Sequence, residues 1–175
     1  MSSTVEPGLD VLDTLLGIAP GSNLHQVRHA RAKVVSATQG SHELFFDPQL
    51  PDNLSLVERL LVAYYACRLT PQVLLADHYL EQLQAQDVDP AVIALIDAGS
   101  IETLDDPRLL AILDFTRTLI VSPVEGDRTA LQRLQAAGLS SAEIVVLGQL
   151  IAFLSYQVRL AAGLGALSAL GEVKS

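Results

Sequence analysis

The chain has 175 residues, 50% of them hydrophobic, and its 20 acidic and 11 basic residues give a formal net charge of −9. This length and apolar content predict one folded domain with a full-sized core and exclude a disordered chain. The negative charge repels phosphate backbones, so nucleic acid is not an expected partner. Cys67 is the only cysteine, which excludes an intrachain disulfide and favours a cytoplasmic location.

The two ends of the chain carry no signal that favours export or membrane insertion. Residues 1–10 lack a basic segment followed by an apolar one, so we expect no secretory signal there. The most apolar stretch, 144–170, is interrupted by Gln149 and Arg159. A spanning helix needs about 20 predominantly apolar residues, so this stretch is predicted to be a core helix and no membrane partner is expected.

Helical periodicity and helix-start signals follow one another along the chain. Thr70, Asp89 and Asp106 each precede a proline, an arrangement typical of a capping residue followed by the first helical turn. The signals predict an all-α, single-domain helical bundle over residues 1–175 with roughly eight helices. The expected ranges are 8–17, 23–38, 55–69, 71–86, 90–98, 107–121, 127–137 and 141–164, with 40–53 as the longest irregular connection.

Two of these helices begin in the same way. Ser55 precedes Glu58, and Ser140 precedes Glu143, at the spacing of a capping box in which the two side chains bond each other's backbone N–H groups. The similar starts fit either a duplicated unit or a common way of beginning a helix.

Three segments of the C-terminal half carry a family resemblance: DPRLLAILDFTR at 106–117, LQAAGLSSAEI at 134–144 and IAFLSYQVRLAAGLG at 151–165. Their order and spacing resemble the carboxymuconolactone decarboxylase (CMD) family, in its alkylhydroperoxidase D-like, peroxidase-related branch. LSLVERLLVA at 54–63 and ADHY at 76–79 extend the resemblance, which covers about residues 30–165.

The resemblance implies an all-α fold, assembly into homo-oligomers, and an antioxidant oxidoreductase activity. In the alkylhydroperoxidase members a Cys-x-x-Cys pair at a helix N-terminus reduces peroxides, and a glutamate and a histidine relay protons. Counting from His78 places the two cysteine positions at Pro71 and Leu74, and counting from Glu58 places them at Thr70 and Val73. Dithiol peroxidase chemistry is therefore not expected.

The functional expectation is a cysteine-pair-independent enzyme with a Glu58–His78 proton relay, acting on a small organic molecule or hydroperoxide. Glu58 fits this role by resemblance and a capping role by its spacing from Ser55. His78 is a candidate acid or base because its ordinary pKa is close to neutral, or else a half-buried structural histidine. Cys67 is expected to be a small buried apolar residue. A redox role is the less favoured alternative, and it would need a resolving thiol from another molecule. The alternative function is a non-catalytic, oligomeric module that binds a small apolar or acidic ligand.

The remaining candidates are ligand-binding or metal-binding residues. His42 is expected to line a pocket beside Tyr64 and Tyr65. Arg159 either binds an anionic substrate or forms an ion pair with Asp114 or Glu143. His25 and His29 have a spacing that two metal ligands use, but no third ligand is evident in the sequence. No metal or cofactor is therefore expected.

Overall fold

The computed structural model describes residues 10–50 and 54–172, and these residues form helices and no strands. The predicted all-α class is confirmed. The described elements, in chain order, are α1 (Val11–Leu15), α2 (Asn23–His29), α3 (Ala32–Phe45), α4 (Leu56–Leu69), α5 (Val73–Gln84), α6 (Pro90–Ala98), the 3₁₀ turn η1 (Ile101–Thr103), α7 (Pro107–Val121), the 3₁₀ turn η2 (Pro123–Glu125), α8 (Arg128–Ala136) and α9 (Ser141–Glu172).

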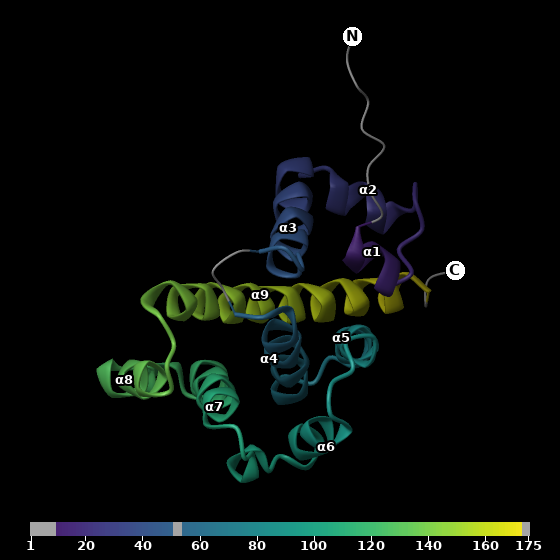
Figure 1. The fold of residues 1–175 in the computed structure, drawn as a ribbon. Helices are drawn as coiled ribbons and strands as arrows, with labels where there is room; N and C mark the ends of the chain where they lie inside the picture. Colours follow the sequence, from purple (N-terminus) through teal and green to yellow (C-terminus); the bar gives the residue numbers. More distant parts are fainter. Residues whose placement is uncertain (1–9, 51–53, 173–175) are drawn as a thin grey trace.

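The long helix α9 divides the fold. It runs across the molecule in Figure 1, with α1, α2 and α3 on one side and α4 to α8 on the other. Its most extensive packing is against α4, which also packs against α5 and α7. Nine consecutive residues of α4, from Arg59 to Cys67, are buried. A helix apolar all round its circumference must be enclosed by other elements, and α4 is accordingly the centre of the core.

Most of the predicted helix starts are confirmed by their caps. Asp89 accepts a hydrogen bond from Ala91 N, and Asp106 accepts from Arg108 N and Leu109 N. Each is followed by proline at the first helical position, where the missing N–H costs nothing. Both predicted capping boxes form, at Ser55–Glu58 and at Ser140–Glu143.

Four predicted boundaries are wrong. The last helix does not end at 164 but continues to Glu172. The expected helix 23–38 is two helices, separated between His29 and Ala32. The second of them continues to Phe45, into the segment 40–53 that was expected to be irregular; residues 51–53, like residues 8–9 of the first expected helix, lie outside the described residues. Thr70 was expected to cap the start of the next helix, and this prediction is also wrong. The Thr70 N–H donates to Ala66 O, so Thr70 lies at the end of α4. The next helix begins at Val73, with Gln72 as its cap.

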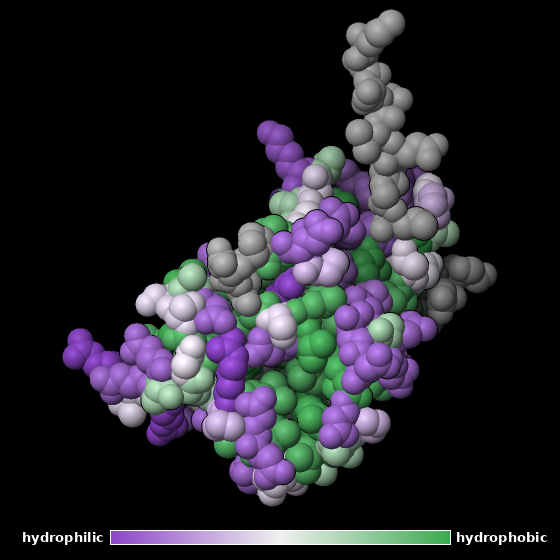
Figure 2. Space-filling view, in the orientation of Figure 1, coloured by the Kyte–Doolittle hydropathy of each residue, from purple (hydrophilic) through white to green (hydrophobic). Residues whose placement is uncertain are grey.

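Apolar surface gathers in the middle of the face shown in Figure 2, around α4, and polar residues flank it. Among the described residues, α9 is the one helix long and apolar enough to cross a membrane, judged by length and composition. The core helix of a soluble protein meets the same criteria, and α9 buries Leu147, Leu150 and Leu154 in the interior. The cytoplasmic location and the lack of a membrane partner stay predictions.

Candidate functional site

Two histidines from different helices meet beside the core. His42 on α3 and His78 on α5 have ring centroids 5.7 Å apart. Phe46 and Tyr79 contact the same imidazoles, with centroid distances of 5.0 Å for His42–Phe46 and 5.3 Å for His78–Tyr79. Both histidines are partly buried. The structure thus places two titratable side chains, 36 positions apart in the sequence, at one aromatic-lined site.

Both imidazoles of this pair are neutral at pH 7. Burial, followed by the charge of His78, lowers the pKa of His42 to about 4. Burial also lowers the pKa of His78. Gln82 Nε2 lies 2.9 Å from His78 Nε2, and an amide NH₂ only donates, so His78 Nε2 accepts and the His78 proton is on Nδ1. For His42 Nδ1, which is buried, the described residues offer no hydrogen-bond partner.

A buried polar pair lies directly behind the histidines. The Tyr79 hydroxyl donates to Gln157 Oε1 over 2.6 Å, joining α5 to α9. The Gln157 amide nitrogen is buried and finds no hydrogen-bond partner among the described residues. Burial raises the pKa of Tyr79 well above its ordinary value, with a smaller contribution from Cys67. Tyr79 therefore keeps its proton.

Cys67 has the environment of a structural thiol. It is 1% exposed in the last turn of α4. Burial raises the pKa of its thiol to about 12. The thiolate is the nucleophilic form of cysteine, so this residue does not supply the redox chemistry of the missing cysteine pair.

Glu58 is held by groups other than His78. Its Oε2 accepts from Ser55 N at 2.7 Å within the capping box, and its Oε1 accepts from Arg108 Nε at 2.7 Å. Arg108 Nη2 also donates to Glu143 at 2.6 Å. The two capping boxes therefore share one arginine, which joins the starts of α4, α7 and α9. This arrangement favours the structural role for Glu58.

The structure gives the three predicted pocket residues different contacts. Tyr64 donates from its hydroxyl to Asp97 Oδ1 at 2.7 Å, and burial followed by this bond raises the pKa of Tyr64 to about 12. Tyr65 is buried on the same helix, and burial raises its pKa too. The ring contacts of His42 are instead with Phe46, His78 and Tyr79.

The expected ion pair of Arg159 is also wrong. Arg159 is exposed, and its Nη1 donates to Ser155 O at 2.7 Å. Asp114 instead binds Arg117 at 2.6 Å, and Glu143 binds Arg108. An anion-binding role for Arg159 stays a prediction.

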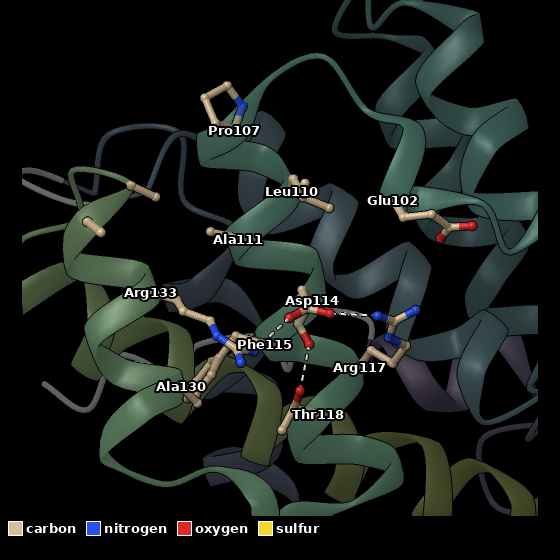
Figure 3. Close-up of a pocket in the computed structure, with 12 residues that line it drawn as sticks. Glu102, Pro107, Leu110, Ala111, Asp114, Phe115, Arg117, Thr118, Ala130 and Arg133 are labelled. Atoms are coloured by element: carbon tan, nitrogen blue, oxygen red, sulfur yellow. Dashed lines mark hydrogen bonds and ion pairs between the residues drawn. The ribbon is translucent and has the colours of Figure 1, made fainter.

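A cavity lies between α7 and α8 and has a volume of about 470 Å³. Its wall is mostly apolar, with Leu110 and Phe115 beside three alanines of α8 and the turn that follows it. Figure 3 shows Asp114 between Arg117 and Arg133 at the edge of this cavity, at distances of 2.6 Å and 3.8 Å. The sequence carried no signal of this cavity, because it depends on the packing of two helices.

The chain matches no protein-family model, and it matches none of the curated proteins.

Proposed function

We propose that the chain is an alkylhydroperoxidase-like protein of the CMD type that transfers a proton on a small organic substrate at His42 and His78, without dithiol chemistry. The observation that supports this function is the meeting of two neutral imidazoles 5.7 Å apart in an aromatic, partly buried site. Each neutral imidazole has one N–H and one lone pair, so the pair offers both a proton donor and a proton acceptor.

His42 replaces Glu58 as the partner of His78 in this proposal. The like charge of His78 is one of the causes that lower the pKa of His42, which means that a proton on one ring disfavours a proton on the other. The pair is neutral before the reaction and carries one proton at a time during it. One imidazole accepts that proton from a carbon of the substrate, which leaves a carbanion or enolate. The imidazolium returns the proton to a different carbon of the same anion, so that the product is an isomer of the substrate.

Reduction of peroxides is not part of the proposed chemistry. A dithiol mechanism needs a thiolate that attacks the peroxide and a second thiol that resolves the product. Cys67 is a buried thiol with a pKa of about 12. The positions where the resemblance expects cysteine are occupied by Thr70, Pro71, Val73 and Leu74.

Turnover of small lactone acids tests the proposal, with hydroperoxide plus a dithiol reductant as the comparison substrate. We expect turnover of the lactone acid, and we expect His78→Gln and His42→Gln to lower kcat by roughly 10²–10⁴-fold, the usual contribution of a positioned acid or base. Cys67→Ala and Glu58→Gln are the matched controls and should retain kcat. Equal rates in the wild type and in His78→Gln would remove His78 from the mechanism.

The cavity between α7 and α8 favours a second candidate function, a non-catalytic module that binds a small, mainly apolar ligand. Its volume of about 470 Å³ is within the range of small-molecule pockets, and its apolar wall with a few charged groups at the edge is typical of them. Titration of octanoate by calorimetry tests this function. Ala111→Phe should fill the cavity and abolish the binding, whereas His78→Gln should leave it unchanged.

A further inference from the structure

A separate cluster of titratable side chains lies between the first two helices. Gly17 and Gly21 have φ values of 62° and 80°, conformations that favour glycine, and they allow the chain to turn back after α1. Ser22 then caps α2 by accepting from His25 N. The turn brings one face of α2 against Asp13 of α1.

Asp13, His25 and His29 present three metal-binding atoms at this place. One atom from each side chain lies within 4.8 Å of the other two. The His29 Nε2 to Asp13 Oδ2 distance is 2.7 Å, and the His25 and His29 rings stack with centroids 4.0 Å apart. The sequence showed only the two histidines, because Asp13 is 12 positions before His25 and reaches them only through the turn.

Arg28 orients the carboxylate of this cluster. Its Nη1 lies 2.6 Å from Asp13 Oδ1, and its Nη2 lies 3.0 Å from Asp10 Oδ1. The arginine therefore occupies one oxygen of Asp13 and leaves the other oxygen toward His29. The carboxylates of Asp10 and Asp13 and the guanidinium of Arg28 together leave one negative charge beside the imidazoles. This negative charge favours the binding of a divalent cation. Partners of this kind around a metal ligand fix its orientation and increase metal affinity.

We propose that Asp13, His25 and His29 form a Zn²⁺ site. Two imidazole nitrogens and one carboxylate oxygen are a donor set of catalytic zinc sites, where water or substrate takes the fourth position. Hard cations such as Mg²⁺ and Ca²⁺ prefer all-oxygen surroundings. Zn²⁺ takes the place of the hydrogen-bonded proton between His29 and Asp13, and the His29 side chain, 31% exposed, leaves the site open to solvent.

The competing interpretation is a purely structural contact, in which a hydrogen bond between His29 and Asp13 joins α1 to α2. The two interpretations differ at His25. A structural contact needs only Asp13, His29 and Arg28, whereas a zinc site needs the second imidazole. Substitution of His25 preserves the 2.7 Å contact of His29 with Asp13 and therefore tests the metal site without breaking the junction of the helices.

The experiment is a Zn²⁺ titration of the chelator-treated protein against a chromophoric competitor, with Mg²⁺ and Ca²⁺ as comparison ions. We expect one Zn²⁺ per chain and no competition from the two hard cations. His25→Ala should lower the Zn²⁺ affinity by at least about 100-fold, because loss of a surrounding partner alone costs about 10–100-fold. His42→Gln removes a histidine outside the cluster and is the matched control, with unchanged affinity expected.

Thermal unfolding with and without Zn²⁺ gives a second readout for variants that lose stability. Zn²⁺ should raise the Tm of the wild type and of His42→Gln, because a ligand that binds only the folded state stabilises it. It should not raise the Tm of His25→Ala or His29→Ala. Equal Zn²⁺ affinity in the wild type and His25→Ala, or no stoichiometric binding by the wild type, would overturn the proposal.

Discussion

His42 illustrates how burial changes the chemistry of a single residue. Its ring is partly enclosed by Phe46, His78 and Tyr79. Burial and the charge of His78 lower its pKa to about 4, while Glu43 and Asp10 act in the opposite direction with smaller effects. A free histidine has a pKa of about 6.5. The folded chain therefore binds a proton at this position less readily than the unfolded chain does.

This difference predicts a pH dependence of stability. Above pH 6.5 the ring is neutral in both states and contributes nothing to the dependence. As the pH falls from about 6.5 to about 4, the unfolded state binds the proton and the folded state does not, so the free energy of unfolding decreases, by on the order of 2–3 kcal/mol. Urea unfolding of the wild type and His42→Gln across this range measures the effect. Parallel pH profiles of the two proteins would contradict it.

Cys67 gives a second prediction at the level of one residue. Its thiol is buried and has a pKa of about 12, and the thiolate fraction falls tenfold for each unit of pKa above the solution pH. Iodoacetamide should therefore modify the folded protein at least about 100-fold more slowly than a small exposed thiol. Mass spectrometry after timed quenching measures the rate, and modification in denaturant is the control. Prompt labelling of the folded protein would indicate a reactive cysteine.

Arg59 acts between two elements, the end of α3 and the start of α4. It is 1% exposed, and its Nε and Nη2 donate to Leu54 O at 3.0 Å and to Asp47 O at 2.9 Å. A further bond runs from Nη1 to Phe45 O. Burial lowers the pKa of the guanidinium, although arginine stays charged at pH 7. The guanidinium group thus donates hydrogen bonds to backbone carbonyls where the chain passes from α3 to α4.

Replacement of Arg59 tests this junction. Arg59→Met keeps much of the side-chain volume but leaves the carbonyls without their donors, and each buried group left unsatisfied costs about 1–3 kcal/mol. We expect a loss of about 3 kcal/mol or more in the free energy of unfolding, measured by urea denaturation. Arg59→Lys keeps the charge without the planar fork and should lose less. Wild-type stability in Arg59→Met would show that the bonds contribute nothing.

The sequence predicted the elements better than the contacts between them. Capping boxes at Ser55 and Ser140 are local signals, since cap and partner are three residues apart, and both form. The shared contact of Glu58 and Glu143 with Arg108 joins positions up to 50 residues apart, and no local pattern encodes it. The same holds for His42 beside His78. No local pattern marks Arg59 either, because burial of an arginine depends on which carbonyls the fold brings to it.

At the scale of the whole molecule, α9 has a buried side and an exposed side that carries three large aliphatic residues. Val145, Leu167 and Leu170 are 58%, 55% and 64% exposed. With about 100° of rotation per residue, these three side chains lie within about 60° of one another around the helix axis. Tyr156, 42% exposed, lies on the same side and bonds Thr38 of α3. The helix thus carries a discontinuous line of exposed apolar side chains. This line is interrupted where α3 crosses it and by Gln149 and Arg159, which are exposed on the same side.

The homo-oligomer stays a prediction, and the exposed line on α9 is the surface where we expect α9 of a second copy to bind. Large exposed apolar surfaces are typical of interfaces between subunits, and pairing by a two-fold axis lets the same residues cover one another. We expect sedimentation velocity to show an assembly larger than the 18.7 kDa chain. Val145→Glu and Leu167→Glu should shift it toward the monomer, because a charge buried at the interface is costly.

Val124 provides the matched control for the oligomer. It lies in η2, outside α9, and at 91% it is the most exposed of the large apolar side chains described. Val124→Glu introduces the same charge without touching the line on α9, so it should leave the sedimentation coefficient unchanged. A monomeric wild type would contradict the assembly. An unchanged oligomer in Val145→Glu and Leu167→Glu would instead place the interface on another surface, and the apolar area around α4 in Figure 2 would then be the next to substitute.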